Sequence, residues 1–150
     1  MPEPLVVVEQ VAGATEELRA AVERLLPQLS SSASAPGLDQ LDEIVGAAGT
    51  SLLVARDPAR GDAIVGSLTL VTYRIPTGVH AIIEDVVVDR DARGRGVGAA
   101  LVNRALELAH SLGVRNVDLS SRPSREAANR LYQRLGFLKR DTNVYRHQPD

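Results

Sequence analysis

The sequence predicts an α+β fold in which an antiparallel meander of strands precedes a β-α-β unit. Apolar, β-branched runs alternate with segments of helical spacing, and turn residues join three consecutive runs in the middle of the chain. A clear amphipathic helix then separates the next two runs. With 150 residues, of which 44% are hydrophobic, the chain has the size and apolar content of one domain over residues 1–150.

The first half of the chain predicts one strand, two helices and a hairpin. Apolar residues recur at helical spacing in both helices, and Thr15 is a suitable N-cap for the first. The turn Asp57–Asp62 (DPARGD) favours a hairpin between the two strands that flank it. The predicted segments are Leu5–Val11 (strand), Thr15–Leu29 and Leu38–Ala48 (helices), and Ser51–Arg56 and Ala63–Tyr73 (strands).

The second half predicts two helices among four shorter strands. Gly113 and Gly136 each stand where a helical pattern stops, as helix-ending glycines do, and Ser124 is a suitable N-cap for the second helix. The predicted segments are Val79–Val88 (strand), Ala99–Leu112 (helix), Val114–Leu119 (strand), Ser124–Leu135 (helix), and Phe137–Lys139 and Asn143–Arg146 (strands).

Composition excludes several classes of protein. The chain has no cysteine, which excludes disulfides, zinc ribbons, iron–sulfur clusters and thiol catalysis. No apolar stretch approaches the roughly 20 residues that span a bilayer. A secretory signal begins with a positively charged region, and this chain has no basic residue before Arg19. We therefore expect a cytoplasmic protein without membrane contact. The three histidines show no metal-ligand spacing, so no metal is expected.

Charge is distributed unevenly along the chain. Residues 1–88 carry a balance of −7 and residues 89–150 a balance of +5, so the C-terminal part attracts anions. Arginine outnumbers lysine 16 to 1, which favours bidentate phosphate contacts, although a compositional bias of the genome explains it equally well. With one Phe, three Tyr and no Trp, stacking platforms for nucleic acid are scarce. A small phosphorylated ligand is the better interpretation.

The segment Arg93–Gly98 (RGRGVG) has the features of a phosphate-binding turn. It follows a predicted strand and opens an amphipathic helix, whose first amide groups have no acceptor within the helix. Glycines let the backbone approach a ligand, and Arg93 and Arg95 add charge-assisted contacts. A Rossmann-type dinucleotide site is the rival interpretation, because Gly94, Gly96 and Ala99 match its spacing. Rossmann glycines follow their strand immediately, whereas five residues, Asp89–Arg93, separate these glycines from the strand, which argues against that site.

Two motifs resemble the GCN5-related N-acetyltransferases, the GNAT superfamily. Arg93, Gly96 and Gly98 match the signature Gln/Arg-x-x-Gly-x-Gly/Ala, and Ala127–Phe137 (AANRLYQRLGF) is similar to the family's later helix-to-strand motif. The resemblance covers about residues 50–147. It implies a mostly antiparallel, mixed sheet of six to seven strands, flanked by about four helices and splayed between the fourth and fifth strands.

The resemblance also implies a cosubstrate, acetyl-CoA, and the residues that bind it. The main chain of Val86, Val87 and Val88 is expected to pair with the pantetheine arm, and Tyr132 to protonate the leaving thiolate. Many members carry an asparagine seven residues before that tyrosine. This chain has Arg125 there, which leaves Ser124 or Asn129 to make the contact. The residues expected to hold the pyrophosphate are Arg93, Gly94, Arg95, Gly96, Val97, Gly98 and Ala99.

Two acids in the fourth predicted strand are candidates for the general base that removes the amine proton. Glu84 and Asp85 stand within an apolar run, where burying an acid without purpose is unfavourable. Adjacent strand residues face opposite sides unless a bulge intervenes, so only one is expected to reach a cleft. The segment IEDVVV resembles the glucosamine-phosphate branch of the family, which favours Glu84 as base. Asp85 then orients substrate or structure.

These observations predict an N-acetyltransferase that transfers an acetyl group from acetyl-CoA to a primary amine of a small molecule or peptide by direct attack. The alternatives are an acyl-CoA-binding module without turnover and the dinucleotide-binding protein. Three acids near the second helix, Asp39, Asp42 and Glu43, indicate either a cationic acceptor or a solvated face. The identity of the acceptor and the oligomeric state, including a homodimer, stay open.

Overall fold

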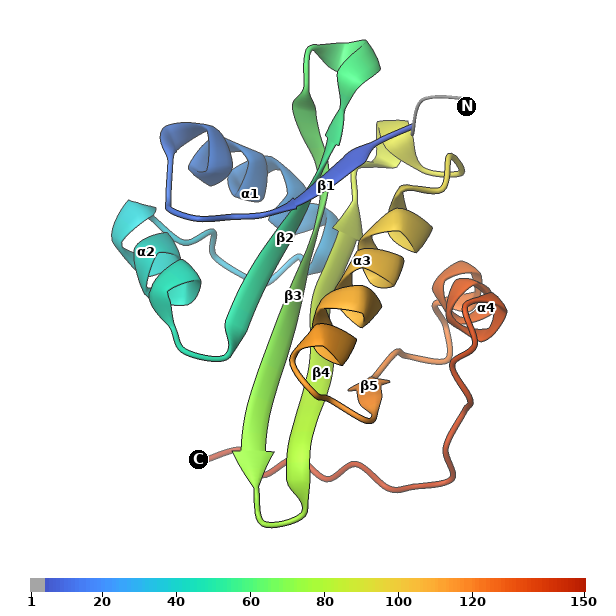
Figure 1. The fold of residues 1–150 in the computed structure, drawn as a ribbon. Coiled ribbons are helices and arrows are strands. Elements are labelled where there is room, and N and C mark those ends of the chain that lie inside the picture. The colour runs from blue at the N-terminus through green and yellow to red at the C-terminus, as the bar shows by residue number, and fades with distance from the viewer. Residues whose placement is uncertain (1–4) are drawn as a thin grey trace. The chain divides into compact units, whose positions relative to one another are not determined.

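The computed structural model describes residues 5–150 and divides into two compact units, one ending at Ser120 and one from Ser121 to Asp150. The first unit holds all the strands and three of the helices, and the second holds the last helix (Figure 1). The strands are β1 (Val7–Gln10), β2 (Thr50–Asp57), β3 (Ala63–Ile75), β4 (Gly78–Val88) and β5 (Val117–Leu119), and the helices are α1 (Glu16–Leu29), α2 (Leu38–Gly46), α3 (Val97–Ser111) and α4 (Glu126–Arg134).

The sheet is mixed, and its strands lie in sequence order, β1-β2-β3-β4-β5. Neighbouring strands are antiparallel except β4 and β5, which are parallel and are connected through α3. The β2–β3 turn is held by Asp57, whose side chain accepts a hydrogen bond from the amide of Ala59 at 2.9 Å. Gly61 completes that turn with φ +65°, a left-handed conformation that glycine adopts without strain.

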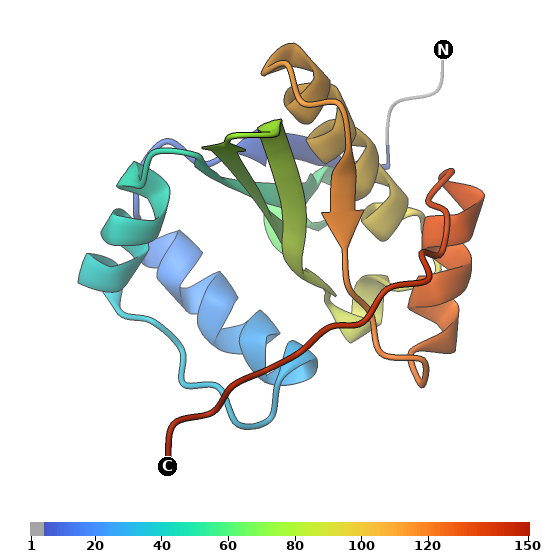
Figure 2. The same ribbon diagram turned by 90° about the horizontal axis from the view of Figure 1, so that it is seen from below.

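Helices cover both faces of the sheet, as the view from below shows (Figure 2). Helices α1 and α2 pack on one face and α3 on the other, so the strands are buried on both sides. Thr15 caps α1 as predicted, accepting a hydrogen bond from the amide of Leu18 at 3.1 Å. The core under α1 and α2 consists of Leu18, Ala21, Leu25, Leu41, Leu52, Val54, Ile64 and Val87.

Gly66 on β3 lets α3 approach the sheet closely. A β-carbon at this position would lie 3.1 Å from a methyl group of Leu101, 3.2 Å from one of Val97 and 3.1 Å from the carbonyl oxygen of Val87. These distances are shorter than ordinary van der Waals contacts, so a larger residue would push the helix away. Val97 is the first residue of α3, and Gly66 therefore sets where the start of that helix lies above the sheet.

The sheet has five strands in the described residues, so the expectation of six to seven was wrong, although the α+β class and the mixed, mostly antiparallel sheet with four helices were right. The two last predicted strands, 137–139 and 143–146, do not form. They are only three and four residues long, and a strand exists only where a neighbour completes its ladder. Their apolar residues are exposed instead: Leu138, Val144 and Tyr145 are each more than 80% accessible.

Most predicted boundaries differ from the structure by one or two residues, and three of the differences bear on the site. Helix α3 begins at Val97 rather than Ala99, because Gly96 rather than a side chain precedes its first turn. Helix α4 begins at Glu126, with Arg125 and not Ser124 at the cap position. Strand β5 is limited to the three residues that pair with β4. The mostly antiparallel sheet also excludes the Rossmann-type interpretation, which requires parallel strands.

No helix in the described residues is long and apolar enough to cross a membrane.

Candidate active site

A β-bulge in β4 brings the two predicted acids to the same face of the sheet. The register pairs Ser67 with Val87 and then Thr69 with Glu84, so two residues of β4 lie opposite one residue of β3. Asp85 is one of these two, and its φ of +51° is left-handed. Asp tolerates this conformation better than most residues. The one-residue insertion changes the alternation of side chains along β4.

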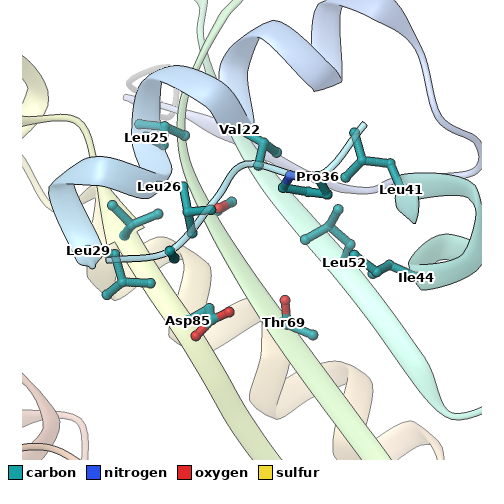
Figure 3. Close-up of a pocket in the computed structure, with 13 residues that line it drawn as sticks. Val22, Leu25, Leu26, Leu29, Pro36, Leu41, Ile44, Leu52, Thr69 and Asp85 are labelled. Atoms are coloured by element: carbon teal, nitrogen blue, oxygen red, sulfur yellow. The ribbon is translucent and has the colours of Figure 1, made fainter. Parts of the chain in front are cut away.

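Asp85 lines a pocket between the sheet and helices α1 and α2, together with Thr69 and Val87. Figure 3 shows Asp85 and Thr69 on the sheet below Leu26 and Leu29 of α1. The register partner of Glu84 is Thr69, and opposite residues of an antiparallel pair project from the same face. Both acids therefore lie on this face, which is the exception that the sequence analysis allowed for a bulge. Glu84 is exposed and does not line the pocket itself.

The pocket has a volume of about 270 Å³ and mostly apolar walls. Helix α1 forms one wall, α2 another, and the segment between them closes part of the opening. Three polar side chains lie on the sheet, and Asp85 is the one ionisable group among the thirteen lining residues in the described part of the chain. We call this space the sheet–helix pocket; its lining is Val22, Leu25, Leu26, Leu29, Ala33, Pro36, Leu41, Ile44, Leu52, Ser67, Thr69, Asp85 and Val87.

The turn after β4 forms an anion site at the start of α3, which we call the phosphate cradle (Arg93–Ala99). Gly94 and Gly96 have φ of +76° and +83°, and a β-carbon at either would meet no atom within 4 Å, so the space beside the turn is open. Ala100 donates to the carbonyl of Gly96 at 3.0 Å, which leaves the three amides before it without an acceptor inside the helix. No side chain caps this end of α3. A phosphate group fits such a site.

The two arginines of the phosphate cradle are held differently. Arg93 is exposed and donates from Nε to the carbonyl of Val88 at 3.1 Å. The guanidinium of Arg95 lies 3.4 Å from a carboxylate oxygen of Asp57, whose side chain is only 1% exposed. Arg60 reaches the same oxygen at 3.5 Å. Asp57 therefore compensates its buried charge with two arginines and fixes the position of one of them beside the cradle.

Strand β4 has a free edge next to the cradle. It pairs with β5 only at Ala81, Ile82 and Ile83, and within residues 5–150 no strand continues that ladder toward Val88. No strand in the described residues pairs with Val86–Val88 on the β5 side, although the carbonyl of Val88 accepts a hydrogen bond from Arg93 Nε. This is the edge where the family resemblance predicts that an extended ligand adds like a strand. The divergence begins next to Glu84, so the acid lies where the two strands separate.

Helix α1 is tied to the start of the phosphate cradle by two side chains, which we call the α1 clamp (Arg24 and Gln28). Arg24 donates to the carbonyl of Ile64 at 2.5 Å and to a carboxylate oxygen of Asp89 at 3.3 Å. Gln28 accepts from the amide of Arg90 at 2.9 Å. Burial raises the pKa of Asp89, but hydrogen bonds from the Asp91 amide, Gln28 and Arg24 outweigh it, so the pKa lies below its ordinary value.

The second unit contains the predicted acid, Tyr132. Its side chain is 8% exposed and packs edge-on against Phe137, with ring centroids 6.0 Å apart. Burial raises the pKa of the Tyr132 phenol, and the charge of Arg125 offsets part of that rise, so the hydroxyl is protonated at neutral pH. Asn129 donates to the carbonyl of Arg122 at 3.0 Å, and Ser124 is exposed. The contact predicted for Ser124 or Asn129 stays a prediction.

Sequence reasoning did not identify the residues that support the site. Arg24, Gln28 and Asp57 act through partners 38 to 65 residues away in the sequence, so no local pattern marks them. An acid at the end of an apolar strand was the one signal available for Asp57. No group of three or more potential metal ligands occurs in the described residues. His80 stacks on Tyr73 and shares a hydrogen bond with Thr77.

Comparisons with known proteins relate the chain to acetyltransferases. The model of the acetyltransferase (GNAT) family matches residues 18–137. An uncharacterized N-acetyltransferase of Methanocaldococcus jannaschii is 43% identical over 61 residues, which are 41% of this chain and 27% of that protein. A probable glucosamine 6-phosphate N-acetyltransferase 2 of Oryza sativa subsp. japonica is 34% identical over 97 residues, which are 62% of this chain and 57% of that protein. These matches thus span less than two thirds of either relative.

Among solved structures, a crystal structure described as a transcriptional regulator from Bacillus halodurans C-125 has a TM-score of 0.79. It is 27% identical, and the match covers 95% of this chain and 99% of that one. This chain and that structure therefore share their fold nearly end to end.

The α1 clamp predicts a pH-dependent contribution to stability. Asp89→Asn removes the charge that the clamp and the Asp91 amide stabilise, and should lower the free energy of unfolding by about 1 kcal/mol at pH 7. Because the folded-state pKa lies below 3.8, this difference should persist at pH 5 and disappear as the pH falls through that folded value. Urea unfolding of both proteins at pH 7, 5 and 2 measures it.

Asp91→Asn is the matched control, because that side chain is exposed and the neighbouring amide is retained. An equal loss of stability in both variants, or a loss that is unchanged well below pH 3.8, would contradict the role of Asp89.

Proposed function

Since the chain belongs to the acetyltransferase (GNAT) family, we propose that it transfers an acetyl group from acetyl-CoA to a primary amine by direct attack. The observation that carries this proposal is the placement of two acids on one face of β4, next to the free strand edge and one turn before an open anion site. Acetyl-CoA, when bound, supplies the thioester that the amine attacks.

The residues present fit this cosubstrate. The amides of Val97, Gly98 and Ala99 have no acceptor inside α3, and would hold the pyrophosphate together with Gly94 and Gly96. Arg93 and Arg95 add positive charge, the second from a position fixed by Asp57. The main chain of Val86, Val87 and Val88, which β5 does not pair, would bind the pantetheine arm, and one of its amides would polarise the thioester carbonyl.

Proton transfers are assigned to two side chains. Glu84 removes a proton from the amine, directly or through water, so that the nitrogen lone pair is free to form the N–C bond. Tyr132 donates its phenolic proton to the sulfur as the C–S bond breaks, and a raised pKa keeps that proton in place before the reaction. Asn129 is the residue we assign to the pantetheine contact, with Ser124 as its alternative.

An acyl-CoA-binding module without turnover is the remaining alternative, and release of free CoA in the presence of an amine distinguishes the two. The predicted cytoplasmic location and the predicted option of a homodimer stay predictions.

Binding of CoA to the phosphate cradle should be abolished by Gly98→Asp. The new carboxylate would stand among the amides that bind the pyrophosphate, while an acid in the first turn favours the helix itself. Saturating CoA, at a hundredfold excess over Kd, should stabilise the wild type by about 2.7 kcal/mol and the variant not at all. Thermal unfolding with and without CoA measures this. Asn103→Asp, an exposed position further along α3, is the control for added charge.

Retention of the CoA shift by Gly98→Asp, or its absence in the wild type, would argue against the cradle as the cosubstrate site.

Glu84→Gln should reduce turnover by roughly 10²–10⁴, the usual contribution of a general base, with CoA affinity unchanged. The glutamine keeps the size of the side chain but does not accept the amine proton. Asp85→Asn is the matched variant one residue along, and its kcat should change less. Steady-state rates of CoA release at equal folded fraction compare them. A larger loss of kcat in Asp85→Asn than in Glu84→Gln would show that Asp85, and not Glu84, is the general base.

Tyr132→Phe separates a proton donor from a packing residue, because phenylalanine keeps the ring against Phe137 and removes only the hydroxyl. We expect turnover to fall about ten- to a thousandfold, a barrier rise of roughly 1.4–4 kcal/mol, with CoA binding and stability nearly intact. Rates and melting curves come from one preparation. If the rate per folded molecule is unchanged with two different amines while stability falls by about 1–3 kcal/mol, the hydroxyl is structural.

A further inference from the structure

The lining of the sheet–helix pocket indicates which amine it accepts. Ten of its thirteen lining residues are aliphatic or proline: eight form the walls on α1, α2 and the connecting segment, and Leu52 and Val87 lie on the sheet. The three polar residues, Ser67, Thr69 and Asp85, come from β3 and β4 only. The acid and the two hydroxyl groups therefore all lie on the sheet, beside two aliphatic side chains, whereas the walls on the helices and the connecting segment are entirely apolar.

Asp85 is placed to recognise an ammonium group. It is exposed while lining the pocket, so it lies where the pocket meets solvent rather than at its closed end. Its neighbour Glu84 is the proposed base and lies on the same face of the sheet. An amine held by Asp85 and Thr69 would thus have its nitrogen next to the group that deprotonates it, with the rest of the molecule against the apolar walls.

The walls argue against phosphorylated and polycationic acceptors. Within the described residues no Arg, Lys or His lines the pocket, so a phosphate placed there would lose its hydration without gaining a counter-charge. Sugar hydroxyl groups would find few partners on aliphatic walls, each at a cost of about 1–3 kcal/mol. The acids of α2 do not help a polycation: Asp39, Asp42 and Glu43 are exposed, and Leu41 and Ile44 are the α2 residues that face the pocket.

The volume limits the size of the apolar part. A cavity of about 150 Å³ lined by aliphatic and aromatic side chains holds a benzene molecule. A pocket of about 270 Å³ therefore has room for one aromatic ring, or an alkyl chain of similar bulk, together with a short arm that carries the amine.

We propose that the acceptor is a primary monoamine with a compact apolar body, an arylalkylamine or alkylamine, whose ammonium group binds Asp85 and Thr69 and whose body fills the sheet–helix pocket. This inference rests on the proposed acetyltransferase activity for its reaction but on the pocket lining for its ligand. The bonds formed and broken are those of the acetyl transfer described above. An N–C bond forms, a C–S bond breaks, and Glu84 takes up the amine proton.

The test compares phenethylamine and hexylamine with glucosamine 6-phosphate and spermidine, using the full chain. Release of free CoA gives kcat/KM for each amine, and calorimetry with CoA present gives binding without requiring turnover. We expect the two apolar amines to exceed the two polar ones by at least about tenfold in kcat/KM. A preference for glucosamine 6-phosphate or spermidine overturns the proposed substrate class and leaves the acetyltransferase function standing.

Three variants locate the amine. Ile44→Ser, in the pocket wall, should raise KM for phenethylamine about tenfold, whereas Leu38→Ser, an exposed leucine on the same helix outside the pocket, should leave it unchanged. Asp85→Asn should raise KM by about ten- to a hundredfold and change kcat less than Glu84→Gln does. Equal effects of the two serine variants, or an unchanged KM in Asp85→Asn, would overturn the placement.

Calorimetry separates this inference from the proposed function. Binding of phenethylamine that is weakened by Ile44→Ser, without CoA release from any of the four amines, would support the ligand class and contradict the acetyltransferase activity.

Discussion

The β-bulge at Asp85 is the constraint on which the candidate site depends. A regular β4 would place Glu84 and Asp85 on opposite faces, and one of them would lie under α3 in the apolar core. One extra residue places both acids on the side of α1 and α2, and the left-handed φ of Asp85 is the local strain that accompanies it. The regular ladder with β3 on either side of the bulge holds that conformation.

The same stretch of β4 is where the sheet opens. Pairing with β5 ends at Ile83, immediately before the two acids, and the unpaired main chain continues to the phosphate cradle. One strand therefore provides an acid on its face, hydrogen-bonding groups on its edge and an anion site at its end. Helix α1 joins these parts, since Leu26 and Leu29 line the pocket while Arg24 and Gln28 hold the start of the cradle turn. A shift of α1 would therefore move the pocket wall and the turn that leads into the cradle together.

Features that depend on a few neighbouring residues could be predicted from the sequence, and features that depend on distant partners could not. The cradle and the Thr15 cap follow from glycines, a hydroxyl group and the geometry of a helix end, all within a short segment. The bulge depends on how β4 aligns with β3, which no pattern in β4 encodes. The short β5, the missing strands after residue 136 and the Asp57–Arg95 pair likewise depend on contacts far apart in the chain.

Gly66 has a consequence for how this domain tolerates sequence change. It does not line the pocket, but its missing side chain sets how near Leu101 and Val97, the first helical residue of the phosphate cradle, come to the sheet. One added methyl group at position 66 would require the side chains of Val97 and Leu101 and the carbonyl of Val87 to give way by a few tenths of an ångström, at the point where α3 begins. Variation there is therefore restricted by the geometry of a site several residues away, and an engineer redesigning the cosubstrate specificity of this domain would have to keep position 66 fixed.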